Sequence, residues 1–405
     1  MKKTNMLVEI ARVVDRGNCS GCGTCALLNP ATKMTLSEDG YMRPVTQDGH
    51  ESNTDTNLLR TFAEACPGRR VDAQRPETST RHPILGPITS IWEAYAIDPE
   101  IRFKGSSGGT ITALSTWLLE TDRVAQVHAA QPDNSDPRRT EAVRVTDSKD
   151  TLRTAGSRYA PVSVTPTVDI DSSTSAVVAK PCEISALRKL MQLRGTDGPI
   201  LLSFFCAGVP SQHATDDLVE RLGIPSDQEL ESLRYRGHGW PGEFTAQDTE
   251  GNVARTSYDV SWGSHLGPAI QSRCKICPDG VGESADITAG DYWRADERGY
   301  PDFANAEGVS VLIARTARGE TLLREAAAAG VISIRSIDPD SVAAIQPSQS
   351  VRRRTLSGRL LGGRVAGHLP PRYRGFGLLG LSARAPVKSA RAAVGTYIRA
   401  RRWQR

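Results

Sequence analysis

Eight cysteines fall into two sets whose spacing suits iron-sulfur chemistry. The first set begins with Cys19, Cys22 and Cys25, which have two residues between successive thiols. Bacterial ferredoxins use such a run, and the fourth cysteine of their motif ligates a second cluster. Here Asn29 takes that fourth place, so the missing ligand to the same cluster must come from elsewhere. Cys66, which precedes a proline, is the candidate, and we expect one 4Fe-4S cluster in this segment. Zinc, which favours paired C-x2-C units, and unrelated buried thiols are the alternatives.

The second set contains two single cysteines and one close pair. Cys182 and Cys206 each follow an apolar segment that is typical of a buried strand, and Cys274 and Cys277 form a C-x2-C unit. Loops at the carboxyl ends of neighbouring parallel strands lie at one edge of a sheet, which is where such sheets place their sites. Four thiols suffice for a second 4Fe-4S cluster. Three alternatives stay open: a structural zinc, a catalytic Cys182 activated by a helix N-terminus, and a redox-active Cys274/Cys277 pair.

Two glycine-containing loops are candidates for contact with an anionic or ring-shaped cofactor. The first opens a predicted helix, where free N–H groups and the helix dipole favour an anion; it comprises Ser106, Ser107, Gly108, Gly109 and Thr110. The second offers a turn, a cation and an aromatic face; it comprises Gly156, Ser157, Arg158 and Tyr159. Each loop taken alone is equally consistent with a helix cap or a structured turn.

Alternating strand and helix patterns would position these residues. Residues 90–97 and 175–180 are typical of strands, as are residues 199–205, and helices are expected to follow each cysteine or glycine loop. Residues 308–334 predict strand, helix and strand. We therefore expect a mixed α/β fold with a small ferredoxin-like domain at 1–75, a flavin and iron-sulfur body at 76–350, and a basic tail at 351–405. Residues 34–49 resemble a hairpin with Asp39-Gly40 as its turn.

Composition favours a globular protein without membrane spans. Hydrophobic residues make up 39% and charged residues 24% of the 405 residues, and we find no apolar run of roughly 18 residues that would suggest a transmembrane helix. The start lacks the apolar core of a signal peptide. These features predict a cytoplasmic protein, in which cysteines serve as ligands or redox groups rather than disulfides.

The charge is distributed unevenly. Thirteen arginines, one lysine and no acidic residue lie between positions 351 and 405, whereas the net charge of the whole chain is only +4. With its many glycines and prolines, this segment is interpreted as a surface extension, with a short basic helix after residue 387. A solvated tail, contact with an anionic membrane at the inner face and an acidic protein partner are the alternatives. Nucleic acid is not expected, because no recognition motif accompanies the charge.

Seven short motifs in one order resemble the coenzyme F-420 hydrogenase/dehydrogenase beta-subunit family, which is itself similar to the chlorophyll-pathway reductases. They are SSGG, GSRY, KPCEI, FFCAG, YRGHGWPG, CKICPDGVGESADI and GDYW. The resemblance extends from about Cys19 to about Ile334 and implies FAD beside a 4Fe-4S cluster. It further implies that the second cysteine set holds that cluster, that the two glycine loops contact the flavin, and that Lys180 lies near the flavin ring or its phosphates.

The resemblance implies an oxidoreductase that passes electrons between a ferredoxin-type partner and coenzyme F-420 or another organic hydride acceptor. Two alternatives are a ferredoxin-dependent reductase of a tetrapyrrole or other membrane-proximal substrate, and an electron-transfer subunit of a larger complex without its own catalysis. No deazaflavin-specific residue is recognisable. Tyr159, Glu183 and His238 are the candidates for a proton donor.

Overall fold

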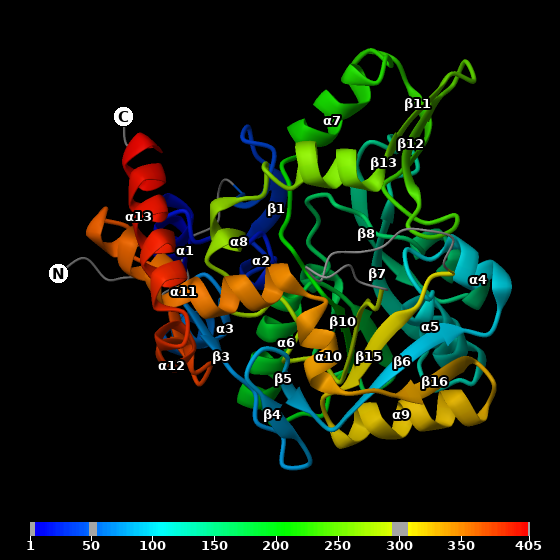
Figure 1. Cartoon of the computed structure of the whole chain (residues 1–405), viewed down its shortest axis with the longest axis horizontal. Helices are drawn as coiled ribbons and strands as arrows, with labels where there is room; N and C mark the ends of the chain where they lie inside the picture. The colour runs from blue at the N-terminus through cyan, green and yellow to red at the C-terminus, as the bar shows by residue number, and fades with distance from the viewer. Residues whose placement is uncertain (1–4, 48–54, 294–306, 404–405) are drawn as a thin grey trace.

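Eight strands form one mixed sheet at the centre of the structure (Figure 1), a computed structural model that describes residues 5–47, 55–293 and 307–403. Parts of the predicted hairpin (48 and 49), of the first domain (1–4 and 50–54) and of the tail (404 and 405) lie outside the described residues. In spatial order the strands are β16 (Ile332–Ser336), β6 (Ser90–Ala96), β15 (Ser310–Ala314), β14 (Ile287–Asp291), β10 (Ile200–Phe204), β9 (Ser175–Val178), β7 (Gln126–Pro132) and β8 (Thr140–Val145). The expectation of a mixed α/β fold is confirmed.

The middle of the sheet is parallel and buried on both faces. Strands β14, β10, β9 and β7 pair in parallel, whereas β15, β6, β16 and β8 pair antiparallel to their neighbours. Strands covered on both faces are near-continuous apolar runs, as in SAVV and ILLSF. The predicted strands at 175–180 and 199–205 are therefore confirmed, with Cys182 and Cys206 following their carboxyl ends.

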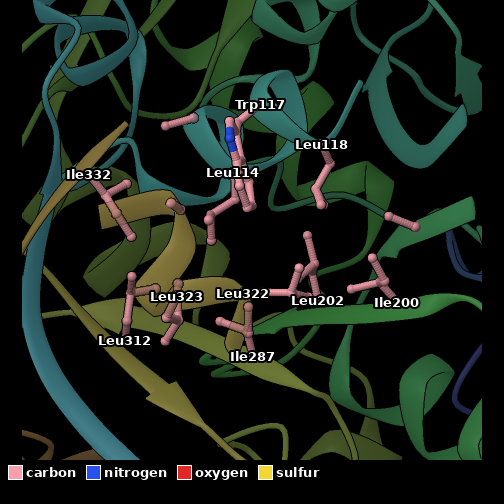
Figure 2. Close-up of a cluster of buried hydrophobic side chains, with 14 of the residues drawn as sticks. Leu114, Trp117, Leu118, Ile200, Leu202, Ile287, Leu312, Leu322, Leu323 and Ile332 are labelled. Atoms are coloured by element: carbon pink, nitrogen blue, oxygen red, sulfur yellow. The ribbon is translucent and has the colours of Figure 1, made fainter. Parts of the chain in front are cut away.

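Helices cover both faces of this sheet. Figure 2 shows Leu114, Trp117 and Leu118 of α5 (Thr110–Glu120) packing with Leu322 and Leu323 of α9 (Ala317–Ala328) over strand residues of one face. On the other face, α6 (Pro181–Arg194) buries Ile184, Leu187 and Leu190 against Val177 and Leu201. The remaining helices of the body are α4 (Pro99–Lys104), α7 (Gln212–Arg221), α8 (Ser272–Lys275) and α10 (Pro339–Ala344), with 3₁₀ turns at Ser148–Thr154 and Thr165–Thr167.

Two small sheets flank the central one. Strands β11 (Leu230–Arg234), β12 (Glu243–Asp248) and β13 (Val253–Ser257) form an antiparallel sheet around buried Tyr235 and Phe244, followed by a π-helical segment, Asp259–Leu266. Strands β4 (Thr80–His82) and β5 (Gly86–Ile88) form a short antiparallel pair. One wall of the cavity described below is lined by Arg236, which follows β11, Tyr258, which follows β13, and Trp262 of the π-helical segment.

The N-terminal segment packs as a small unit of helices and one hairpin. It contains α1 (Met6–Asp15), α2 (Thr24–Leu28), β1 (Thr32–Leu36), β2 (Met42–Thr46), α3 (Thr56–Ala65) and β3 (Arg70–Asp72). Strands β1 and β2 pair antiparallel on either side of residues 37–41, which confirms the predicted hairpin. Met6, Ile10 and Phe62 are buried together with Cys25 and Cys66, so this small core is formed partly by thiols.

The C-terminal segment is folded against the body, which corrects its interpretation as a surface extension. Helix α11 (Pro347–Val365) crosses the boundary predicted after residue 350 and buries Arg353 and Leu356. It is followed by β17 (Arg372–Arg374), α12 (Leu378–Ala383) and α13 (Pro386–Trp403), and the predicted basic helix is confirmed by α13. Its glycines contributed to that interpretation, but Gly358 and Gly362 allow α11 and α13 to approach closely. In the described part of the chain, no helix is both long and apolar enough to span a bilayer.

The Gly362→Leu variant is expected to be destabilised by about 1–3 kcal/mol, because it overpacks the α11–α13 contact. A Cβ atom at Gly362 would overlap the carbonyl oxygen of Ala393. Urea unfolding measures the effect. Gly380→Ala in α12 is the control, since nothing lies within 4 Å of its added Cβ atom; equal stability of the two variants would contradict this packing.

Candidate functional site

A cavity of about 320 Å³ lies above the carboxyl edge of the parallel strands. Its walls are the loop that opens α5, the segment 154–164, the ends of β9, β10 and β14, the π-helical segment, and the start of α11. This is the edge at which parallel sheets place ligands. The structure therefore brings strand ends and both predicted cofactor loops to one place.

The two predicted cofactor loops contact each other. The backbone N–H of Ser157 donates a hydrogen bond to Oγ of Ser106. Ser106, Ser107, Gly109 and Thr110 line the cavity, as do Gly156, Ser157, Arg158 and Tyr159. Gly108 is the exception: it lies behind the wall, and its N–H donates to Oγ of Ser310 at 3.0 Å. A Cβ atom there would approach the carbonyl oxygen of Ala94 to 2.6 Å, so Gly108 permits close packing.

The start of α5 carries a buried polar atom without a partner. Gly109 is the N-cap residue, with φ of +71°, and has no side chain to cap the helix. The next residue, Thr110, is 2% exposed and lines the cavity, and its Oγ1 has no hydrogen-bond partner among the described residues. Buried hydroxyls in folded proteins are usually satisfied. A ligand in the cavity would satisfy this one.

Arg158, a predicted flavin-contact residue, lines the cavity, but its guanidinium hydrogen-bonds to groups of the neighbouring strands and loops. The guanidinium donates to Oγ1 of Thr140 and to the carbonyls of Leu233, Pro137 and Arg139, at 2.8 to 3.1 Å. These contacts tie the 156–159 loop to β8 and β11. Arg158 therefore organises the wall behind the cavity.

Arg236 is the cavity cation that the sequence interpretation missed. It is 2% exposed, and its guanidinium donates to Oδ2 of Asp291 at 2.8 Å and to the carbonyl of Ser106 at 2.6 Å. The rings of Trp240 and Tyr258 lie 5.1 and 4.6 Å from its Cζ. Its motif, YRGHGWPG, and that of Asp291, GDYW, were both recognised, but only the fold joins them.

Lys180 and Glu183 form a buried ion pair at the floor of the cavity. The Lys180 Nζ lies 2.8 Å from Oε2 of Glu183 and donates to the carbonyl of Val162 at 2.6 Å. Burial alone would lower the pKa of Lys180, but Glu183 and the thiol of Cys182 outweigh burial and raise the pKa. The ammonium is thus held in its charged form beside the cysteine loop.

Of the three candidate proton donors, two line the cavity and one does not. Tyr159 and Glu183 are wall residues, whereas His238 lies outside, with its ring 5.4 Å from that of Phe103. Tyr258 is an additional phenol in the wall. Burial raises the pKa of Tyr258 well above its ordinary value, and neighbouring Tyr159 adds to this, so Tyr258 is protonated at neutral pH.

The first cysteine set is gathered into one buried group. Burial raises the pKa of the Cys66 thiol, and the next causes are its neighbours Cys22, Cys25 and Cys19. The body supports this group: Oγ of Ser163 donates to the carbonyl of Gly21 at 2.8 Å. Gly21 and Gly23 have positive φ angles, and a Cβ atom at either would collide with Met42 or Pro166. Cys66, the predicted distant member, lies near the other three thiols.

Of the second cysteine set, Cys206 lines the cavity and lies near Cys182, Cys274 and Cys277. Burial raises the pKa of Cys206 to about 12, and Cys274 and Cys277 contribute to that rise. The pKa of Cys182 is raised first by burial and also by Glu183, Cys22 and Cys206. Cys182 therefore lies near both Cys22 and Cys206, and Cys206 lines the cavity.

Helix α11 holds the Cys206 loop from the other side. Arg352 donates to the carbonyls of Cys206 and Ala207 at 2.8 and 3.2 Å, and Gln349 donates to that of Cys206 at 3.2 Å. Arg359 donates to the carbonyl of Lys275 at 2.9 Å, inside the C-x2-C unit. Arg352 and Arg359 were assigned to the tail, so the sequence analysis did not place them near the site.

The eight thiols are the candidate metal ligands of the chain. Among the described residues, no group of three or more histidine, cysteine, aspartate or glutamate side chains could hold a metal ion as placed. The donor sets are nevertheless uniform, with four thiols in each and no disulfide. Thiolates are the ligands of 4Fe-4S clusters.

Comparisons with known proteins place most of the body in one family. The family models for the coenzyme F420 hydrogenase/dehydrogenase beta subunit match residues 91–168 (N-terminal part) and 173–340 (C-terminal part), together more than half of the chain. Helix α11 begins beyond the matched residues.

Named relatives agree with the family models. The coenzyme F420 hydrogenase subunit beta of Methanococcus voltae is 28% identical over 60% of this chain and 83% of its own length. The coenzyme F420-dependent sulfite reductase of Methanocaldococcus jannaschii is 25% identical over 78% of this chain, which spans only 47% of that protein. A chain of the F420-reducing [NiFe] hydrogenase complex from Methanosarcina barkeri is 23% identical, with 68% of this chain and 95% of that chain covered and a TM-score of 0.49.

Proposed function

Since the chain belongs to the coenzyme F420 hydrogenase/dehydrogenase beta-subunit family, we propose that it is an iron-sulfur flavoprotein oxidoreductase. It passes electrons between an iron-sulfur partner protein and coenzyme F420 or another organic hydride acceptor. The names of its relatives support coenzyme F420 as the acceptor, because they include a hydrogenase subunit, a sulfite reductase and a formate dehydrogenase subunit, all F420-linked.

The contiguity of the three sites carries this proposal. The first cysteine group lies close enough to Cys182 for Cys22 to affect its pKa, Cys182 lies close enough to Cys206 for the same effect, and Cys206 lines the cavity. A path from a buried thiol group through a second thiol group to a ligand cavity suits stepwise electron transfer. A zinc site would not require such a path.

The cavity fits a flavin in three respects. The N-terminus of α5 has no side-chain cap and carries the unpartnered hydroxyl of Thr110, which suits the phosphates of FAD. Arg236 and Lys180 supply positive charge at two parts of the wall. Aromatic residues Tyr159, Tyr258 and Trp262 lie on one side, where they can exclude water from a ring.

The thiol groups fit two 4Fe-4S clusters. In the first, Cys19, Cys22, Cys25 and Cys66 would be the ligands, and the glycines between them allow the loop to wrap closely. In the second, Cys182, Cys206, Cys274 and Cys277 would be the ligands, with Arg273 and Arg352 nearby to balance negative charge. When bound, a flavin exchanges hydride with the organic acceptor and single electrons with a neighbouring cluster.

Anaerobic purification tests the proposal directly. We expect about eight iron atoms per chain, as two cubane clusters require, together with one FAD and reduction of coenzyme F420 when a reduced ferredoxin is supplied. A chain that contains zinc in place of half of the iron would reject the second cluster. A preparation with clusters but no flavin would reject the enzyme and favour an electron-transfer subunit.

The Arg352→Gln variant should lower the reduction potential of the second cluster, because a cation beside Cys206 favours the added electron. Roughly 1 kcal/mol is expected for one charge near the surface, or about 40 mV for one electron. A redox titration monitored by electron paramagnetic resonance measures it. Arg354→Gln is the control, since this exposed arginine is on the same helix; equal potentials in the two variants would count against Arg352.

A further inference from the structure

A second hollow, of about 330 Å³, lies between the N-terminal segment and the residues that connect α11 to α12. Strand β17 of that connection pairs in parallel with β3, which fixes residues 372–374 beside residues 70–72. We call this feature the basic hollow. Its lining includes six arginines: Arg12, Arg16, Arg69, Arg70, Arg372 and Arg374.

Positive charge in the basic hollow is only partly neutralised. Glu9 pairs with Arg12 and Arg69, and Arg70 pairs with Asp72. Burial lowers the pKa of Arg69, and the like charge of Arg372 lowers it further. Arg16, Arg372 and Arg374 are exposed and take part in none of the ion pairs between described residues. These three side chains are available to an anionic partner.

The basic hollow adjoins the first cysteine group. Asn18, directly before Cys19, and Gly68, two residues after Cys66, both line it. Asn18 is 3% exposed and donates from Nδ2 to the carbonyl of Leu369 at 2.7 Å, while its Oδ1 has no partner among the described residues. A protein seated here would therefore lie against the loops that hold these thiols.

The surrounding surface favours a protein over a lipid bilayer. From residue 351 onward the cations are thirteen arginines and one lysine. Arginine binds carboxylates in bidentate pairs, and protein interfaces are enriched in arginine and depleted in lysine. Leu369, which is 56% exposed, adds an apolar contact at the hollow. Figure 1 shows α1, α3, α11 and α13 together at one end of the molecule, away from α7.

We infer that the basic hollow is the docking site for an acidic iron-sulfur electron-transfer protein, whose carboxylates pair with Arg16, Arg372 and Arg374. The inference rests on the proposed function for the electron path behind the hollow. A cluster held by the first cysteine group would accept one electron from the reduced partner, with no bond formed or broken and no proton transferred. The positive charge of the arginines attracts the acidic partner, which increases the association rate and orients the partner toward Cys19 and Cys66.

The test uses the full-length protein, purified anaerobically, and a reduced bacterial two-cluster ferredoxin as the probe. In the triple variant Arg16→Glu, Arg372→Glu, Arg374→Glu, the second-order rate of reduction by ferredoxin is expected to fall at least about tenfold at low salt. The difference should shrink near 1 M salt, where the screening length falls to about 3 Å. Reduction by dithionite, which needs no docking, should be unchanged.

Matched variants keep the inference falsifiable. Arg221→Glu, an exposed arginine at the end of α7, should leave both rates unchanged. If the triple Glu variant misfolds, the triple Gln variant replaces it and should show a smaller, salt-dependent loss. An unchanged ferredoxin rate, or a loss equal to that in Arg221→Glu, overturns the docking site.

A binding assay with oxidised ferredoxin, in which no electron is transferred, tests this inference separately from the proposed function. Salt-dependent binding of oxidised ferredoxin should be lost in the triple variant even if the chain contains no flavin. A second result would overturn the inference in favour of a membrane surface. In that result the wild-type chain does not bind ferredoxin but binds vesicles of equal phosphatidylserine and phosphatidylcholine, and the triple variant does not bind these vesicles. Absent clusters with intact ferredoxin binding would reject the proposed function alone.

Discussion

Replacing Cys206 with alanine is expected to remove about four of roughly eight iron atoms and to abolish ferredoxin-driven reduction of coenzyme F420. Cys206 is the thiol that lines the cavity, so its loss interrupts the path where it reaches the flavin site. A decrease of at least about 100-fold in turnover is expected, equivalent to roughly 2.7 kcal/mol in the barrier. Iron and sulfide analysis and steady-state kinetics measure the two effects.

A half-reaction distinguishes a lost cluster from a damaged cavity. Reduced coenzyme F420 should still bleach the flavin in Cys206→Ala, because hydride transfer does not involve the cysteine groups. Cys66→Ala is the matched control: it should also lose about half of the iron but keep the second cluster next to the cavity. Full iron content in Cys206→Ala, or release of zinc, would contradict the assignment of the second group.

Replacing Arg236 with methionine is expected to cause the largest loss of flavin. The change leaves Asp291 without its cation and removes the donor to the carbonyl of Ser106, which holds the loop before α5. Breaking a buried ion pair by removing one partner costs about 3–5 kcal/mol. When that cost is expressed as weaker flavin binding, FAD retention should decrease on the order of 100-fold or more.

Flavin content after gel filtration and thermal unfolding measure this effect. Arg236→Lys keeps the charge but not the forked donors, so an intermediate loss is expected. Arg234→Met, two residues earlier on β11, is the control, because Arg234 donates to Oγ1 of Thr245 away from the cavity. Normal flavin content in Arg236→Met would show that the Ser106 loop does not depend on this cation.

Much of the local structure follows from sequence patterns. Strands β9 and β10 can be predicted from their apolar residues, because strands covered on both faces contain few polar residues. Their order along the chain, with a helix after each, then places Cys182 and Cys206 at one edge of a parallel sheet. Spacing alone likewise grouped Cys19, Cys22 and Cys25 and required a distant fourth thiol.

The roles of the cations could not be predicted in this way. Arg158 and Arg236 both belong to recognised motifs, but a guanidinium reaches about as far on either side of its backbone, and neighbouring carbonyls decide its direction. The guanidinium of Arg158 donates to the backbone carbonyls of Leu233, Pro137 and Arg139. The guanidinium of Arg236 instead donates to the Asp291 carboxylate and to the Ser106 carbonyl at the cavity. Such choices depend on which strands become neighbours.

The sequence by itself determined the inventory of the site: eight thiols in two sets, two glycine loops, and a parallel sheet edge to carry them. The tertiary structure alone decided that the two thiol sets adjoin, that His238 lies outside the cavity, and that α11 holds the Cys206 loop. The physical reason is that spacing along the chain governs local contacts, whereas contacts between distant segments depend on packing. Gly358 and Gly362 illustrate this: in the sequence they suggested a surface extension, and in the fold they allow α13 to pack against α11.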